Sequence, residues 1–108
     1  NMANAFKNAG AAIGTGRTDV YTCPASTEAV VHAVYLSNVD GTSSVDATIE
    51  VYDNSVTTYY HVGKTIPVPA DSTLVLDKPI NLQESDKLTV TASAASDLEC
   101  FISVLEIT

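Results

Sequence analysis

Apolar and polar residues alternate with a period of two along most of the chain beyond residue 18. The clearest case is Ala47–Asp53, where small or aliphatic residues alternate with Thr, Glu and Tyr. Successive side chains of a β-strand point to opposite faces, so this alternation predicts strands with one buried face. Turn residues separate the alternating segments, which lie at Asp19–Cys23, Ala29–Asn38, Ala47–Asp53, Thr57–Val62, Ser72–Leu76, Lys87–Ser93 and Glu99–Ile107, with shorter extended pieces at Ile66–Pro69 and Ile80–Leu82.

About eight short strands with turns every 8–12 residues and no helical periodicity predict an all-β protein. We expect an antiparallel β-sandwich of Greek-key or jelly-roll type, because many short strands of this kind bury their apolar faces by packing two sheets together. The last segment, Glu99–Ile107, is apolar on both faces. We therefore expect it to be a central strand, or to bury its second face against another subunit.

The first 18 residues lack the alternation of apolar and polar residues, and their composition predicts an N-terminal extended arm. They are small, rich in amides and interrupted by glycines, which disfavour a helix. Phe6 and Ile13 are the apolar anchors of this segment. We accordingly divide the chain into an arm at 1–18 and a β-sandwich domain at 19–108. Such an arm becomes ordered only against a surface, so Phe6 and Ile13 are predicted to bind a partner.

Composition and charge narrow the partners. The chain has 108 residues, of which 45% are hydrophobic, enough for one domain with its own core. Thirteen Asp and Glu against five Lys and Arg give a net charge of −8, which repels phosphate backbones and anionic lipid. No stretch approaches the roughly 20 apolar residues of a membrane-spanning helix. We therefore expect neither nucleic acid nor a membrane as partner.

The sequence offers little catalytic chemistry. It has no nucleophile-elbow, zinc-protease, phosphate-loop or dinucleotide motif. His32 alternates with apolar neighbours and is expected in the core or in an interface. Tyr59, Tyr60 and His61 either form one partly buried strand edge or a recognition patch for sugar or protein. We predict no catalytic residues, no metal ligands, no cofactor and no enzymatic activity.

Two further sets of residues have ordinary structural explanations. Asp40, Asp46 and Asp53 fit solvated turns better than a calcium site, because their spacing is not that of an EF-hand. Cys23 and Cys100 are expected as buried thiols, since two cysteines do not make a disulfide scaffold. A bridge between the two cysteines stays open on their number alone.

Four segments carry a resemblance to a known class of protein. They are Val20–Val31 (VYTCPASTEAVV), Leu36–Gly41 (LSNVDG), Ile66–Leu74 (IPVPADSTL) and Leu82–Ala94 (LQESDKLTVTASA). Together they resemble small structural proteins of tailed bacteriophage virions, over roughly residues 19–107. The chain departs from the pattern at Glu84-Ser85, where those proteins have a small residue and a glycine.

The resemblance implies a structural protein of a bacteriophage virion. Within that class it implies a capsid decoration, or cement, protein that binds the major capsid lattice and stabilises the head. A head–tail joining or tail component is the alternative within the virion. From another class, a module that binds a host-surface protein or glycan stays open.

The same resemblance implies partners and a location. The partners would be the major capsid protein or another virion protein, and further copies of this chain. A homotrimer is expected, because decoration proteins commonly sit at local symmetry axes. The location would be the virion, assembled in the host bacterial cytoplasm, which agrees with the lack of an apolar signal-peptide run in Ala3–Asn8.

Overall fold

The computed structural model describes residues 3–108, which contain nine strands and no helix. The prediction of an all-β sandwich is therefore confirmed. None of the described residues forms a helix long and apolar enough to cross a membrane. The strands are β1 (Asn4–Ile13), β2 (Thr18–Thr22), β3 (Glu28–Asn38), β4 (Val45–Asp53), β5 (Thr58–Val68), β6 (Thr73–Leu76), β7 (Ile80–Leu82), β8 (Lys87–Ala92) and β9 (Leu98–Ile107).

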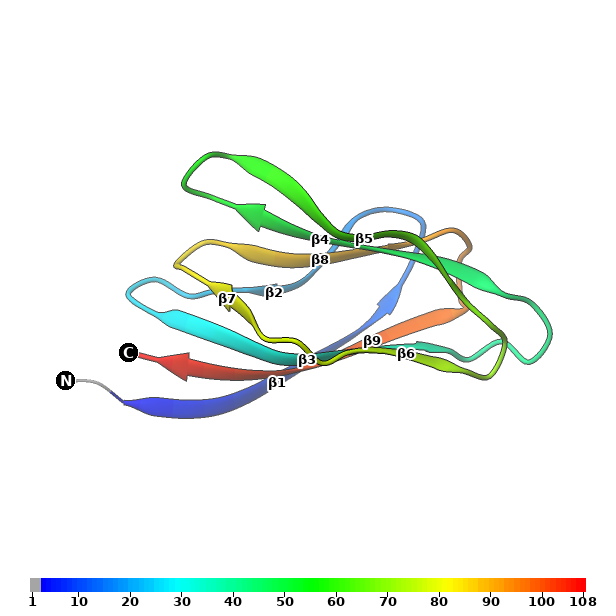
Figure 1. Ribbon diagram of the computed structural model, residues 1–108, viewed down its shortest axis with the longest axis horizontal. Coiled ribbons are helices and arrows are strands. Elements are labelled where there is room, and N and C mark those ends of the chain that lie inside the picture. The colour runs from blue at the N-terminus through cyan, green and yellow to red at the C-terminus, as the bar shows by residue number, and fades with distance from the viewer. Residues whose placement is uncertain (1–2) are drawn as a thin grey trace.

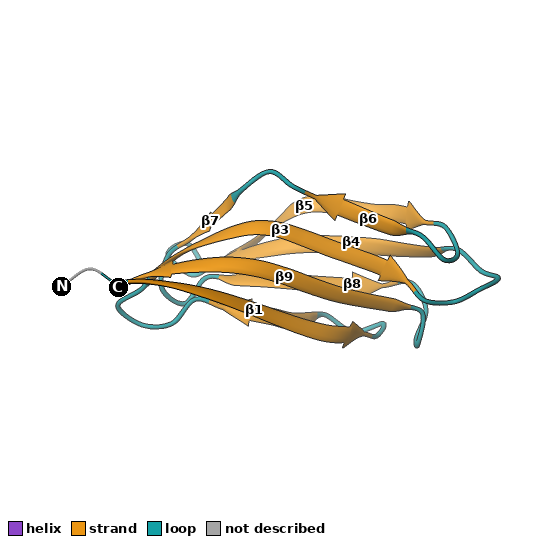
Figure 2. Cartoon of the chain, turned by 90° about the horizontal axis from the view of Figure 1, so that it is seen from below, coloured by secondary structure: helices purple, strands orange, loops and turns teal. Residues whose placement is uncertain are grey.

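The strands form two antiparallel sheets that pack face to face. One sheet has the order β1-β9-β3-β6, with β7 also pairing with β3, and is called the β9 sheet below. The other has the order β2-β8-β4-β5 and is called the β8 sheet. Figure 1 shows the two layers one above the other, and Figure 2 looks onto the β9 sheet with the β8 sheet behind it.

The core lies between the sheets and is built from the alternating positions that the sequence pattern indicates. Leu88 and Val90 of β8, Ile49 of β4 and Ile102 of β9 are all completely buried in one cluster. Strand β9 lies between β1 and β3, so its predicted central position is confirmed. Burial of these aliphatic side chains supplies the main driving force of the fold, at about 1.5–3 kcal/mol each.

Within the segment 1–18 expected as an arm, Asn4–Ile13 form an edge strand of the β9 sheet, and residues 1–2 lie outside the described residues. β1 pairs with β9 along its whole length, from Asn4 opposite Ile107 to Ile13 opposite Leu98. β1 has little apolar alternation of its own. Its backbone N–H and C=O groups nevertheless find hydrogen-bond partners, because β9 offers a free strand edge. The boundary at residue 18 stays a prediction about independent folding, since the sheet begins at Asn4.

Strand β5 joins two pieces that the sequence analysis separates. It runs through the expected break after Val62 and includes Pro67, which is tolerated because β5 is the edge of the β8 sheet. The register shifts twice where β5 pairs with β4, around Ile49. These irregularities let one long strand follow the twisted sheet.

The turn between β7 and β8 explains the departure from the bacteriophage pattern. Ser85 has a φ of 69°, in the left-handed region that favours glycine. Its backbone N–H donates to the carbonyl of Cys23 at 2.8 Å, and the N–H of Cys23 donates to the carbonyl of Asp86 at 2.9 Å. The turn thus keeps the conformation that a glycine would adopt and is secured by the loop after β2.

Candidate functional site

The two residues predicted to bind a partner through an arm lie in different environments. Phe6 is 83% exposed on β1 and stands opposite Leu105 of β9 on the outer face of the sheet. Ile13 is only 2% exposed and belongs to the core. Seven residues apart on one strand, the two side chains point to opposite faces. Of the two, Phe6 is the one that a partner can reach without moving β1.

The three residues expected to form a recognition patch, Tyr59, Tyr60 and His61, do not share one face of β5, because successive side chains of a strand point to opposite faces. Tyr59 stands opposite Tyr52, and His61 stands opposite Glu50, on the outer face of the β8 sheet. Tyr60, which is 56% exposed, stands opposite Val51 on the other face. The structure therefore brings Tyr59 and His61 together and separates Tyr60 from them.

A cluster that the sequence analysis missed surrounds Glu50. Arg17 donates hydrogen bonds from Nε and Nη2 to the Glu50 carboxylate at 3.2–3.3 Å. The Arg17 guanidinium also lies 3.7 Å from the centroid of the Tyr59 ring, and His61 Nε2 is 3.7 Å from Glu50 Oε2. Tyr59 packs at 4.7 Å between ring centroids against Tyr52. The one signal in the sequence was a carboxylate at an outward position of β4.

The charges of this outer face neutralise one another. Lys87 Nζ lies 3.2 Å from Asp19 Oδ2 and 5.6 Å from the Tyr52 ring centroid. Arg17 is already bonded to a carboxylate and stacked on a ring, and Glu50 is nearly buried beneath it. Charged groups that are already paired in this way stabilise the surface of the fold and are not free to bind a substrate. The cluster around Glu50 therefore has a structural role.

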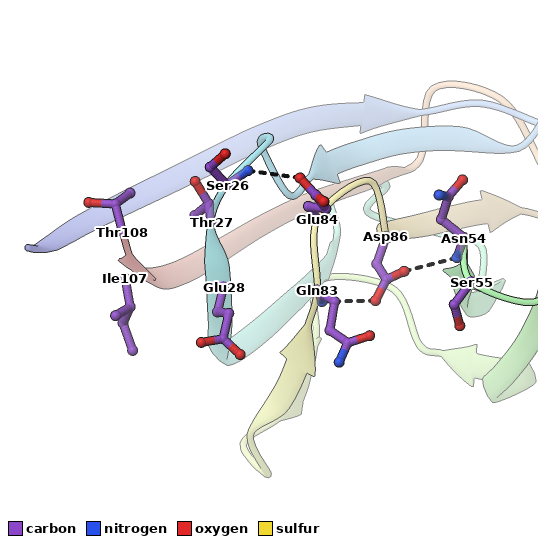
Figure 3. A pocket seen from close by; sticks show the side chains of 10 residues that line it. All are labelled: Ser26, Thr27, Glu28, Asn54, Ser55, Gln83, Glu84, Asp86, Ile107 and Thr108. Atoms are coloured by element: carbon purple, nitrogen blue, oxygen red, sulfur yellow. Dashed lines mark hydrogen bonds between the residues drawn. The ribbon is translucent and has the colours of Figure 1, made fainter. Parts of the chain in front are cut away.

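A hollow lies at the end of the sandwich near the C-terminus (Figure 3). Its volume is about 580 Å³. Asp86 accepts hydrogen bonds from the backbone N–H groups of Asn54 and Gln83 at 2.9 and 2.8 Å. Glu84 accepts one from the N–H of Ser26 at 2.8 Å. These carboxylates fix three loops, and the residues that the structure describes contain no cluster of side chains able to hold a metal ion.

Between the sheets at the same end, Tyr21 and Glu106 join the two layers. The Tyr21 hydroxyl donates to Glu106 Oε2 at 2.5 Å, linking β2 of one sheet with β9 of the other. Burial, and then the hydrogen bond and charge of Glu106, raise the pKa of Tyr21 far above its usual value. The tyrosine therefore stays a neutral donor at every physiological pH.

Cys23 and Cys100 are buried thiols, as the sequence analysis predicts. Cys23 is 1% and Cys100 2% exposed, and they are not bonded to each other. Burial raises the pKa of both thiols, that of Cys100 to about 12. A protonated, inaccessible thiol is neither a nucleophile nor a metal ligand at neutral pH. Of the two positions expected for His32, the core is wrong, because His32 is exposed where the register shifts between Val31 and Ala33, and an interface stays a prediction.

Comparison with known proteins gives a result at the level of the fold. The chain matches no protein-family model and no curated protein sequence. Its structure is similar to a chain of the Bacillus endospore appendages, which form disulfide-linked pili, with 21% identity, a TM-score of 0.59, and coverage of 99% of this chain and 88% of that one. It is also similar to a chain from the acidic stable capsid of Helicobacter pylori bacteriophage KHP30, with 14% identity, a TM-score of 0.58, and coverage of 100% and 92%.

A third similar structure is a chain of the T13 IBDV viral particle, with 8% identity and a TM-score of 0.59. There the match covers 96% of this chain but only 30% of the viral one. The sandwich is thus a fold shared with phage and viral capsid chains and with a pilus chain. At these identities the likeness establishes architecture, and function must be argued from the surfaces.

Proposed function

We propose that this protein is a structural component of a bacteriophage virion, and specifically a decoration protein that binds the major capsid lattice and stabilises the head. The observation that supports this most is the end-to-end match with the KHP30 capsid chain, which leaves no part of this sandwich unmatched. The resemblance of residues 19–107 to virion proteins points the same way. Its partners would be the capsid protein and further copies of itself, with a homotrimer at a local symmetry axis as the expected form.

The surfaces described above suit an assembly role. Glu84 and Asp86 of the end hollow and Glu50 of the outer-face cluster are engaged in fixing loops and strands. The molecule is elongated, with extents of 50 × 27 × 20 Å, and the outer faces of its two sheets offer contact areas. A rigid β-body with extensive faces is what a repeating lattice requires of a component.

A second candidate is a subunit of a pilus-like filament, favoured by the match to the Bacillus appendage chain. In this chain the sulfurs of Cys23 and Cys100 are enclosed by the core. A neighbouring subunit cannot reach either sulfur without unfolding the sandwich. A filament of this chain would therefore have to be held by contacts other than disulfides.

Co-sedimentation tests the proposal directly. The full chain is mixed with empty capsids assembled from the major capsid protein of the same genome, and the bound copies are counted against capsid subunits. A decoration protein saturates in a fixed ratio to the whole lattice and raises the temperature at which the capsids rupture. Saturation at one ring of copies per particle indicates a head–tail or tail component instead. No binding to capsids, together with filaments of the chain alone under the electron microscope, would replace the proposal with the filament candidate.

A further inference from the structure

Apolar side chains gather on the outer face of the β9 sheet. In the described part of the chain, Phe6, Tyr35, Val75 and Phe101 are large apolar residues that are 40–83% exposed, and all four lie on this face. Phe101 alternates along β9 with the buried residues Cys100 and Ile102, and Tyr35 stands along β3 between the buried residues Val34 and Leu36. Nothing in the sandwich itself covers them, so the face is available to another molecule.

Phe6, Tyr35 and Phe101, together with Gly10, Val30 and Leu105, form two rows across strands β1, β9 and β3. In the first row Gly10 of β1, Phe101 of β9 and Tyr35 of β3 stand opposite one another in turn. In the second row the order is Phe6, Leu105 and Val30. Asn8 and Ser103, also directly opposite each other, lie between the rows. We call this area, made of Phe6, Asn8, Gly10, Val30, Tyr35, Phe101, Ser103 and Leu105, the β9 face.

The β9 face carries no charge, whereas the whole chain has a net charge of −8. The carboxylates on this side, Glu28 and Glu99, stand at the two ends of the strands, outside the two rows, and Glu99 also lines the hollow beside Gly10. Two copies of an acidic protein repel each other through charged surfaces. Contact through the β9 face brings them together where that repulsion is weakest.

The shape of the β9 face is complementary to itself. Phe6 projects at one end, and a hollow of about 400 Å³ lies beside Gly10, Tyr35 and Phe101 at the other. The Phe101 ring lies against Gly10, since a Cβ there would stand only 3.3 Å from Cδ1 of Phe101, so this ring forms one wall of the hollow. Phe6 and Gly10 are equally far from Asn8 along β1, in opposite directions.

This arrangement of Phe6 and Gly10 about Asn8 identifies a second copy of the chain as the partner that fits the β9 face. A two-fold axis lying in the plane of contact and crossing the strands at Asn8 and Ser103 exchanges the two rows. It places Phe6 over the partner's Gly10, Phe101 over the partner's Leu105, and Tyr35 over the partner's Val30. Each large side chain then meets a smaller one, and every pair occurs twice, as an isologous interface requires.

The area is adequate for a reversible dimer. Strands β1, β9 and β3, with the short strands β6 and β7 paired along β3, present roughly 600 Å² at about 3.4 Å per residue and about 4.8 Å between strands. A standard interface uses about 800 Å² per partner, so association through this face is concentration-dependent rather than permanent.

We propose that the β9 face is the contact between two copies of this chain, related by the two-fold axis at Asn8 and Ser103, with Phe6 of each copy seated at Gly10 of the other. The inference holds whichever particle or filament the protein belongs to, because it concerns the free protein in solution. It differs from the homotrimer expected of decoration proteins, which makes the two distinguishable by mass.

Sedimentation of the full chain over a wide concentration range tests the contact. The expected result is a reversible change from the mass of one copy to that of two. Phe6→Asp places a carboxylate in the apolar seat and is expected to weaken dimerisation at least about tenfold. Val56→Asp, at a 53% exposed site in the turn between β4 and β5, is the matched control and leaves dimerisation unchanged. Equal melting temperatures of the two variants exclude unfolding as the cause.

Cross-linking locates the axis independently. Asn8→Cys lies on the proposed axis, so mild oxidation should join two copies through this position. Thr22→Cys, exposed on β2 of the other sheet, is the control and should stay uncrosslinked. A single-copy mass at every concentration, a three-copy mass, or equal cross-linking at both positions would each overturn the proposal. A single-copy mass combined with loss of capsid binding in Phe6→Asp would assign the face to the capsid protein instead.

Discussion

Arg17 and Glu50, 33 residues apart in the sequence, form a three-bond ion pair that ties the loop after β1 to strand β4. The Glu50 side chain is 8% exposed and that of Arg17 42%. Arg17 therefore acts as the lid of a nearly buried carboxylate. Without it, the nearest side chain that could pair with the Glu50 carboxylate among the described residues would be the half-exposed imidazole of His61, 3.7 Å away.

Arg17→Ala is expected to lower the free energy of unfolding by about 1–3 kcal/mol, because it leaves a buried carboxylate unpaired. Glu50→Gln removes the charge and should cost less, since Arg17 then extends into solvent. The double variant should be more stable than the sum of the two single losses indicates. Urea unfolding of all four proteins measures this coupling, and strictly additive losses would contradict it.

How far the sequence predicts the fold depends on how strongly each strand alternates. Ala47–Asp53, Lys87–Ser93 and Glu99–Ile107 have a clear period of two. In the structure they form strands β4, β8 and β9, close to the predicted bounds. β1 was missed because its Ala, Asn and Gly residues carry no such signal. Its strand conformation comes from the open edge of β9, which is tertiary information.

The candidate sites were harder to predict for a related reason. Tyr59, Tyr60 and His61 are neighbours in the sequence, but a strand sends neighbours to opposite faces. The Glu50 cluster brings together Arg17, Glu50 and Tyr59 from three distant segments. No local pattern shows such a meeting, because it follows from the sheet order β2-β8-β4-β5.

Ile13 and Phe6 provide a direct test of the edge-strand position of β1. Ile13→Ala should destabilise the protein by about 2–5 kcal/mol, because it removes a buried side chain and leaves a cavity. Phe6→Ala should change the stability of the single copy by less than about 0.5 kcal/mol, since that side chain is exposed. Thermal unfolding at low protein concentration compares the two variants. Equal, small effects would mean that β1 is not anchored in the core and that an independent arm at 1–18 was the better description.

Gly63 of β5 is predicted to be intolerant of a side chain. A Cβ at this position would overlap Cδ1 of Ile66 and stand 3.5 Å from Cδ1 of the buried Ile49. Ile66 must then leave its place, so Gly63→Ala is expected to cost about 1–3 kcal/mol. Gly16→Ala is the control, because its Cβ would meet nothing within 4 Å and its φ is not positive. Denaturant unfolding should leave Gly16→Ala within about 1 kcal/mol of the parent protein, and a reversed order of the two losses would contradict the packing described.

Cys100 should make the fold sensitive to alkaline pH. Burial raises the pKa of its thiol from 9.0 to about 12, so the unfolded chain releases this proton at a lower pH than the folded protein does. The stability associated with Cys100 is therefore fully present below pH 9 and is lost as the pH rises toward 12. Between pH 8 and pH 10.5 the loss from this one group is about 2 kcal/mol.

Comparison with Cys100→Ala isolates that contribution. Tyr21 and Cys23 also have raised pKa values, so both proteins should lose stability in alkali. The variant starts from a lower stability, because alanine fills less of the core, but its stability should fall by about 2 kcal/mol less over the same pH interval. Urea unfolding at several pH values under reducing conditions measures both slopes. Parallel slopes would mean that Cys100 ionises as readily in the folded protein as in the unfolded chain, which is incompatible with its burial between the two sheets.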